Sequence, residues 1–82
     1  MENDLLINLD KVHTTELGVV RIRKNLNLAD IDVVIWCKDK IRNASNIVRW
    51  GKNWYVNIGD AVITVNAHSF TIITAHTIQQ MR

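Results

Sequence analysis

The chain has 82 residues, a net charge of +2 and an apolar content of 48%, which together indicate one small folded domain with a single core. The longest uninterrupted apolar run, Val33 to Cys37, is too short to cross a membrane, and the acidic start lacks the basic region of a secretory signal. A single cysteine excludes an intrachain disulfide and a zinc site built from cysteines alone. We therefore expect a cytoplasmic protein with no membrane partner.

The first part of the chain has the periodicity of helices. Residues 4–12 place apolar side chains at helical spacing and predict a short first helix. Thr14 or Thr15, followed by Glu16, predicts the start of a second helix that ends at about Asn25.

A third helix is predicted over residues 31–44, with Asp30 as its N-cap. The β-branched residues near its start would also suit a strand, but the length of the segment and its charged end favour a helix. Cys37 lies on the apolar stripe of this helix, so we expect a buried core residue rather than a nucleophile.

After Ser45 the periodicity changes from helical to alternating, and turn signals recur at near-regular spacing. They are Gly51-Lys52, Gly59-Asp60 and Ala67-His68. Two-residue turns at these positions predict a four-stranded antiparallel meander over residues 46–77. The expected fold class is therefore α+β, with two or three helices in residues 1–44 packed on one face of the meander, in one domain over residues 1–82.

The same turns predict the register of the sheet. They pair Tyr55 with Val48 and with Thr64, and they pair Thr64 with Thr71. One face is then apolar except for Arg49 and should pack against the helices. The opposite face, called the open face below, mixes polar and aromatic side chains. Its predicted members are Val48, Trp50, Asn53, Tyr55, Asn57, Val62, Thr64, Asn66, Ser69, Thr71 and Ile73.

The stretch RWGKNWYV, residues 49–56, holds three of the five aromatic residues of the chain. The register divides these residues between the two faces. Trp54 points to the core, with Arg49 over its ring as a cation–π partner. Trp50 and Tyr55 point to the open face.

The first and third turns of a meander lie at the same end of the sheet, roughly 10 Å apart. Cations, amides and aromatic rings therefore gather at that end. These candidate ligand-binding residues are Arg49, Trp50, Lys52, Asn53, Tyr55, Asn66, His68 and Ser69. Cations neutralise phosphate and an aromatic ring stacks on a base, so the cluster predicts binding of a nucleotide or RNA. Solvated hairpin turns of no special function are the alternative interpretation.

The histidines form no catalytic arrangement along the sequence. His68 and His76 would lie about 26 Å apart on an extended strand, which is too far for both to act on one reacting group. His13 lies between two helices and could approach either end of the sheet. The spacings match no zinc motif, so we expect no metal and no cofactor, and the catalytic residues stay unknown.

A second basic cluster comprises Arg21, Arg23 and Lys24. Arg21 and Lys24 share a helical face, while Arg23 points elsewhere. The cluster therefore fits a solvated helix face as well as it fits a contact with nucleic acid.

Four stretches, HTTELGVVRIRKNL, DVVIWCKDKI, GKNWYV and ITVNAHSFTIITAH, together resemble a family of short bacterial or phage proteins of unknown function. More loosely, helices followed by a meander that ends in SFTIITAH look like the small ribonuclease toxins of the RelE and barnase-like superfamily. That second resemblance implies an RNA-cleaving enzyme that needs no metal and carries basic, His or Tyr residues on its open sheet face. Here that face offers Tyr55, Asn57, Thr64 and Thr71, but no definite base.

Three functions follow as expectations. The leading one is binding of a nucleotide or RNA through the open face and the end that carries Lys52 and His68. The competing one is a protein-interaction or inhibitor module, of bacterial or phage origin, whose open face pairs with a second copy or a host protein. That interface would consist of Val48, Trp50, Tyr55, Val62 and Ile73. The third is a small ribonuclease toxin, whose expression would arrest growth.

Overall fold

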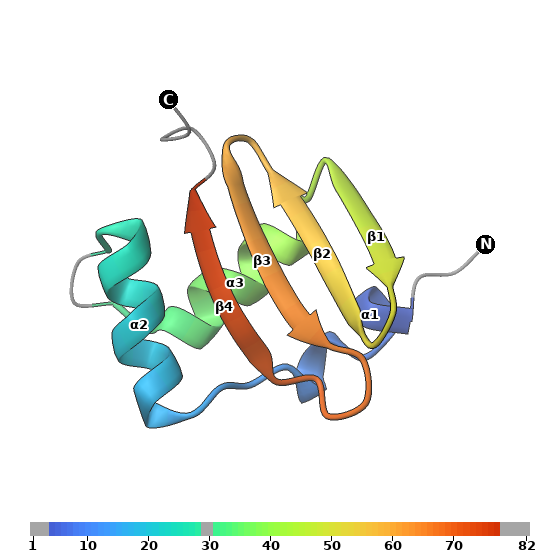
Figure 1. Cartoon of the computed structure of the whole chain (residues 1–82), viewed down its shortest axis with the longest axis horizontal. Coiled ribbons are helices and arrows are strands. Elements are labelled where there is room, and N and C mark those ends of the chain that lie inside the picture. The colour runs from blue at the N-terminus through green and yellow to red at the C-terminus, as the bar shows by residue number, and fades with distance from the viewer. Residues whose placement is uncertain (1–3, 29–30, 78–82) are drawn as a thin grey trace.

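The computed structural model describes residues 4–28 and 31–77. Its elements in chain order are α1 (Asp4–Ile7), the 3-10 helix η1 (Leu9–Lys11), α2 (Glu16–Leu26), α3 (Val33–Arg42), β1 (Asn46–Trp50), β2 (Asn53–Ile58), β3 (Ala61–Asn66) and β4 (Ile72–Thr77). The strands form one antiparallel sheet in the order β1-β2-β3-β4 (Figure 1). The predicted α+β fold class is confirmed, because helices precede a four-stranded antiparallel meander.

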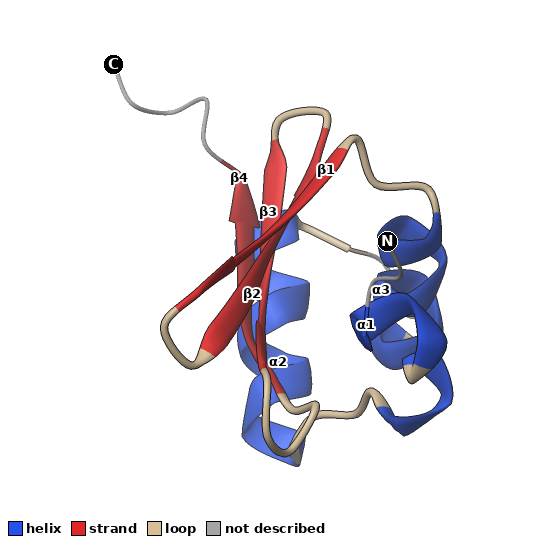
Figure 2. Cartoon of the chain, turned by 90° about the vertical axis from the view of Figure 1, so that its right-hand side faces the viewer, coloured by secondary structure: helices blue, strands red, loops and turns tan. Residues whose placement is uncertain are grey.

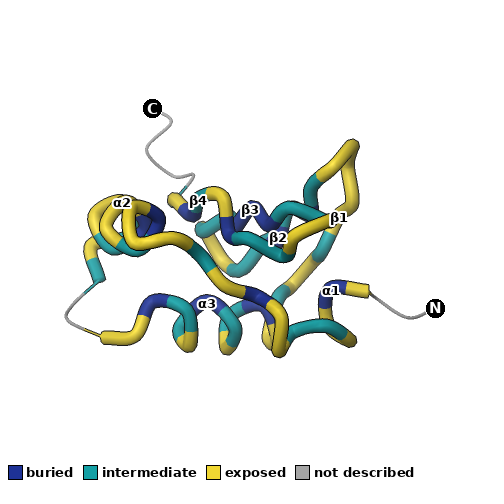
Figure 3. The backbone as a smooth tube through the Cα atoms, turned by 90° about the horizontal axis from the view of Figure 1, so that it is seen from below, coloured by how far each residue is buried: buried dark blue, intermediate teal, exposed yellow. Residues whose placement is uncertain are grey.

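The helices leave one face of the sheet uncovered. Helices α1 and α3 lie on one side of the sheet, to its right in the side view (Figure 2). Helix α2 runs beside β4, almost level with the sheet (Figure 3). The core fills the space between these helices and the sheet. Its buried apolar members are Leu5, Val12, Ile22, Val33, Cys37, Ile41, Trp54, Val56, Ile63, Val65, Ile72 and Ala75.

Helices α2 and α3 begin at side chains that cap them. The Thr15 hydroxyl accepts a hydrogen bond from the N–H of Gly18 at 3.0 Å. The Asp32 carboxylate accepts one from the N–H of Ile35, also at 3.0 Å. Such caps satisfy backbone donors that the helix itself leaves unpaired. The predicted cap Asp30 lies outside the described residues.

Helix α1 is shorter than predicted. It ends at Ile7, and a separate 3-10 turn follows it. The backbone N–H and the side-chain amide of Asn8 both donate to the Asp4 carbonyl, at 3.1 and 2.9 Å. An amide side chain that bonds to nearby backbone competes with continuation of a helix. This competition explains the early end of α1.

Helix α2 is attached to β4 by side chains that reach the strand. The Thr14 hydroxyl donates to the Ile72 carbonyl at 2.9 Å, and the Asn25 amide donates to the Ala75 carbonyl at 3.2 Å. A Cβ on Gly18 would collide with the Thr14 hydroxyl. Glycine at position 18 therefore allows α2 to begin this close to the Thr14 side chain. The helix then runs parallel to β4.

The first two hairpins follow the predicted register. Gly51 and Gly59 have φ angles of +63° and +59°, and neither of the residues that follow them has a positive φ. Positive φ at the first central position alone is typical of a type II′ turn. Tyr55 accordingly pairs with Val48 and with Thr64, as expected.

The prediction for the third hairpin is wrong. Thr64 pairs with Thr74 instead of Thr71, and the connection spans residues 67–71 instead of two residues. Phe70 adopts φ +60°, and its ring stacks on Trp54 with centroids 5.5 Å apart. That aromatic contact offsets the cost of a left-handed backbone, about 1–3 kcal/mol for a residue other than glycine.

A β-bulge in β4 reverses the alternation of its side chains. Val65 pairs with Ile72, and Thr64 pairs with Thr74, so Ile73 is an extra residue in the strand. Such an extra residue changes which face the following side chains occupy. Ile72 and Ala75 are both buried on the helix side. The open face therefore gains Thr74 and His76, whereas the predicted members Ser69 and Thr71 lie in the connection before β4.

Candidate functional site

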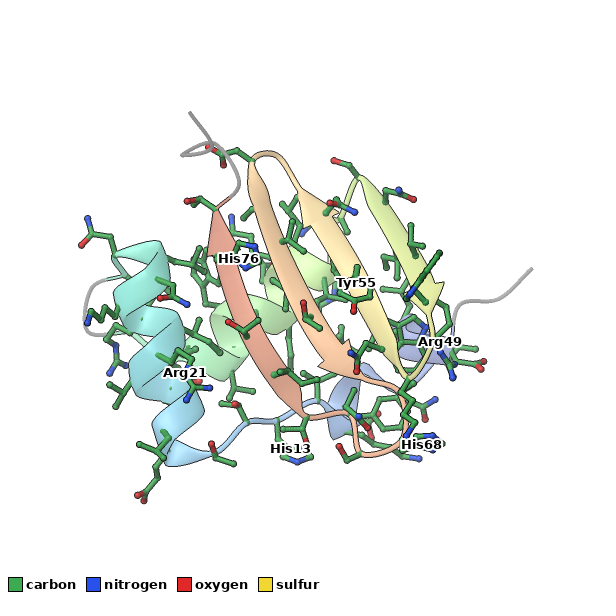
Figure 4. The ribbon with its side chains drawn as sticks, viewed as in Figure 1. His13, Arg21, Arg49, Tyr55, His68 and His76 are labelled. Carbon is green, nitrogen blue, oxygen red and sulfur yellow. The ribbon has the colours of Figure 1, made fainter. Side chains whose placement is uncertain are left out.

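The open face centres on a row of three hydroxyl side chains. Tyr55, Thr64 and Thr74 lie side by side across β2, β3 and β4, and directly opposed side chains have Cβ atoms about 5 Å apart. Tyr55 lies at the middle of this face (Figure 4). Thr64, flanked by the other two, is only 7% exposed. A flat ligand on this face would meet one aromatic ring beside a line of hydroxyls.

Cations outnumber acids around the open face, where Asp60 of the second turn is exposed. None of the four strands contains Asp or Glu. Arg21 and Lys24 are exposed on α2 beside β4, and Lys52 is exposed in the first turn. Arg21 projects from α2 on the same side of the molecule as Tyr55 (Figure 4). This distribution favours an anionic ligand.

The attachment of α2 to β4 determines where Arg21 lies. Thr14 reaches the carbonyl of Ile72, and Asn25 reaches that of Ala75. Arg21 lies between these two contacts along the helix, which places it near the level of Thr74. The helical face shared by Arg21 and Lys24 thus extends the open face beyond the sheet edge. The sequence alone had left the role of the basic cluster Arg21, Arg23 and Lys24 open.

His76 supplies a base on the open face. It pairs across the strands with Val62 and is exposed, two residues along β4 from Thr74. The bulge at Ile73 places it there, and no local sequence signal marks that bulge. His76 and His68 lie at opposite ends of β4, so only His76 is next to the hydroxyl row (Figure 4).

The first and third turns meet at the other end of the sheet. The N–H of Ala67 donates to the Lys52 carbonyl at 2.7 Å. The side-chain oxygen of Asn66 accepts from the N–H groups of His68 and Ser69, both at 2.9 Å, and from the Ser69 hydroxyl at 3.2 Å. Asn66 and Ser69 therefore hold the third turn, while the side chains of Lys52 and His68 are exposed.

The aromatic stretch divides between the faces. The Arg49 guanidinium lies 5.5 Å from the centre of the Trp54 ring and donates to the Gly51 carbonyl at 3.0 Å. Trp54 is buried on the helix side, whereas Trp50 is 73% exposed. The Asn53 amide donates to the Tyr55 hydroxyl at 3.5 Å. Arg49 therefore supports the core side of the sheet, where Trp54 lies, whereas Trp50, Asn53 and Tyr55 line the open face.

A family model described as "Protein of unknown function (DUF3781)" matches residues 6–76. The chain belongs to this family. The match spans α2, the third turn and all four strands except Thr77, the last residue of β4, so the open face lies within the part that defines the DUF3781 family. The resemblance to a family of unknown function is thereby confirmed. No curated protein and no solved structure matches the chain.

A hydrogen-bonded chain that sequence reasoning missed joins the segment before α2 to the third turn. The two ring nitrogens of His13 lie 2.9 Å from the Lys11 carbonyl (Nδ1) and 3.1 Å from the Thr71 hydroxyl (Nε2). A carbonyl can only accept, so Nδ1 carries a proton. The Thr71 hydroxyl lies 2.7 Å from that of Ser69. This chain places His13 at the end of the sheet that carries the third turn.

Backbone hydrogen bonds reinforce that connection. The N–H of His13 donates to the Phe70 carbonyl at 3.1 Å, and the N–H of Ile72 donates to the His13 carbonyl at 2.7 Å. His13 and Thr71 thus form a parallel bridge beside β4. The contact pairs residues 58 positions apart in the sequence, so no local pattern indicates it.

Two further side chains have structural roles. The Arg23 guanidinium donates to the Ile31 carbonyl at 2.8 Å and so holds the segment that precedes α3. Cys37 is fully buried on α3, and burial raises the pKa of its thiol to about 12. A thiol in that state is protonated at neutral pH and does not act as a nucleophile.

Within residues 4–28 and 31–77, no three His, Cys, Asp or Glu side chains gather closely enough to hold a metal ion.

A shallow groove of about 430 Å³ lies away from the open face, along α3. Its lining residues are Ile31, Asp32, Ile35, Trp36, Lys38, Asp39 and Arg42. Two acids and two cations balance there, and Arg42 pairs with Asp39 at 3.7 Å. The groove therefore lacks the excess of cations found around the open face.

In the described part of the chain, no helix is long and apolar enough to cross a membrane.

Proposed function

We propose that this protein binds RNA or a nucleotide on its open face. The observation that carries the proposal is the row of Tyr55, Thr64 and Thr74. That row is not covered by any described helix and lies on strands without carboxylates, between the cations of α2 and Lys52 of the first turn. Single-stranded nucleic acid binds to surfaces of this kind, which join an aromatic ring to a positively charged rim.

Each part of the face has a role in this proposal. The Tyr55 ring stacks on a base, an interaction that contributes about 1–3 kcal/mol per base. Arg21 and Lys52 neutralise phosphates on either side of it. The Thr74 hydroxyl forms hydrogen bonds with a base or a ribose, and Thr64, which is 7% exposed, supports the row between Tyr55 and Thr74. Trp50, Asn53 and His68 belong to the rim, whereas Arg49, Asn66 and Ser69 maintain the protein's own structure.

Fluorescence anisotropy with labelled short oligouridylate and oligoadenylate, at moderate salt, tests the proposal. We expect Tyr55→Ala and Lys52→Ala each to weaken binding, with a loss on the order of tenfold for Tyr55→Ala. Arg42→Gln removes a cation from the α3 side and is the matched control, with no expected effect. Absence of binding above background would contradict the proposal, as would equal affinity in all variants.

Metal-independent RNA cleavage is a second candidate, favoured by the position of His76. A base at this position could take the proton of a ribose 2′-hydroxyl, whose oxygen then attacks the adjacent phosphorus, while Arg21 stabilises the negative charge of the phosphate. The bond from phosphorus to the 5′-oxygen of the next nucleotide breaks, and that oxygen takes a proton from water, which leaves a 2′,3′-cyclic phosphate. The 2′-hydroxyl exists only in RNA, so DNA would not be cleaved. The looser resemblance to small ribonuclease toxins points to the same reaction.

Incubation of labelled RNA with the purified protein in the presence of a chelator tests cleavage. The candidate predicts RNA fragments from the wild type, none from His76→Ala purified in the same way, and growth arrest on expression of the wild type only. Intact RNA together with normal growth would exclude cleavage and leave the binding proposal standing. Equal cleavage by the wild type and His76→Ala would indicate a contaminating nuclease.

A further inference from the structure

The two edges of the sheet differ in what covers them. Along β4, the side chains of Thr14 and Asn25 and the backbone of His13 satisfy outward backbone groups. Strand β1 ends the sheet on the other side, and the described residues place no strand or helix against its outer edge. An uncovered edge strand is a template for pairing with another chain.

The first hairpin determines which backbone groups of β1 point outward. Its two-residue turn makes Trp50 and Asn53 the hydrogen-bonded closing pair. Hydrogen-bonded and non-hydrogen-bonded pairs alternate along an antiparallel ladder, so Val48 also bonds to β2. The N–H and C=O groups of Ile47 and Arg49 therefore point away from the sheet.

We propose that β1 pairs antiparallel with β1 of a second copy of this chain, about a two-fold axis at Val48. In that register Ile47 of each copy lies opposite Arg49 of the other. Every outward N–H then meets an outward C=O. Pairing centred on Arg49 instead would place the two guanidinium groups opposite each other, and like charges in that position are destabilising.

The side chains of β1 fit this axis. Val48 and Trp50 are 40% and 73% exposed, and both point to the open-face side of the strand. The axis brings the two Val48 side chains together and places each Trp50 diagonally next to the partner's Val48. The apolar groups left exposed on the single chain are covered in the pair. On the other side, Arg49 is already folded back over Trp54.

The pairing leaves the open face accessible. An antiparallel strand pair within a continuous sheet is related by an axis normal to the sheet, so both open faces point the same way. This differs from the competing expectation, in which the open face itself is covered by a second copy. The inference is independent of the proposed RNA binding, because it uses only the edge of the sheet.

Cysteine cross-linking tests the register. The two Val48 positions form a non-hydrogen-bonded pair with Cα atoms about 4.5 Å apart, within the reach of a disulfide. The two Trp50 positions lie about 13 Å apart, which is beyond that reach. Cys37 is fully buried and does not compete. We expect oxidised glutathione to cross-link Val48→Cys into a dimer and to leave Trp50→Cys, the matched exposed thiol, largely monomeric.

Light scattering provides an independent measurement that needs no cysteine. The wild type is expected at twice its chain mass of 9.4 kDa at high concentration, and Ile47→Pro, which removes an outward N–H, at the mass of one chain. A wild type that is monomeric at every concentration would overturn the proposal. So would equal cross-linking of the two cysteine variants, or a dimer that persists in Ile47→Pro.

Discussion

The two faces of the sheet consist of alternate residues of the same strands, but their surroundings differ completely. Trp54 and Val56 face the helices and are 5% and 0% exposed, while Tyr55 between them faces away from the helices. On β3, Ile63 is fully buried and its neighbour Val62 lies on the open side. The covered face stabilises the fold, so packing against the helices does not determine the composition of the open face.

The largest expected effect is a loss of unfolding free energy that differs between the two faces. Ile63→Ala removes a fully buried side chain and should lower the free energy of unfolding by about 2–5 kcal/mol. Val62→Ala, one residue away on the open side, should cost less than about 1 kcal/mol. Urea unfolding followed by tryptophan fluorescence measures both values. Similar losses in the two variants would contradict the division into a covered and an open face.

The pH dependence of stability gives the next largest effect. The pKa of Cys37 is about 12 in the folded chain against an ordinary 9.0, so the unfolded chain ionises first as the pH rises. The contribution of this thiol to stability is constant below pH 9.0 and is lost between that value and about 12. The loss is about 1.4 kcal/mol per pH unit within that window.

Comparison with Cys37→Ala isolates this effect from other groups that titrate in alkali. We expect the difference in unfolding free energy between the wild type and the variant to be steady up to about pH 8 and to shrink by about 1.4 kcal/mol near pH 10. A difference that stays constant across this range would show that the thiol is accessible to solvent in the folded chain.

The smallest expected effect concerns the rim of the open face. If RNA binds as proposed, Arg21→Gln removes one phosphate contact, and the slope of log K against log salt for RNA binding should become shallower by about 0.7. The free energy of unfolding of the Arg21→Gln variant should differ from that of the wild type by no more than about 0.5 kcal/mol, because Arg21 is exposed. An unchanged salt slope would show that Arg21 does not contact RNA phosphate and that α2 is not part of the binding surface.

Much of the fold could be predicted from local signals. Helical periodicity with Thr14 or Thr15 as a cap marked α2, and the structure has Thr15 as that cap. Gly51 and Gly59 marked the first two hairpins as two-residue turns. The third hairpin has no such signal. Phenylalanine rarely adopts positive φ, and Phe70 does so here in a turn that the Trp54 ring and His13 stabilise. The sequence therefore predicted a two-residue third turn, and that prediction was wrong.

The candidate site was harder to predict for the same reason. The bulge that follows the third turn decides that Thr74 and His76 lie on the open face. Arg21 joins that face only because Thr14 and Asn25 attach α2 to β4, through contacts between residues more than 45 positions apart. Sequence reasoning named Tyr55 and Lys52 as candidates, and their predicted places on the open face and in the first turn depend on one local hairpin.

An NMR titration of the isotopically labelled protein with a short oligouridylate tests the central claim most directly. The proposal predicts that the Tyr55 ring, the methyl groups of Thr64 and Thr74 and the imidazole of His76 shift as RNA is added, together with the guanidinium of Arg21. Side chains of the α3 groove, such as Trp36, should stay unchanged. Shifts confined to that groove, or a spectrum without shifts, would contradict the assignment of the open face as an RNA-binding surface.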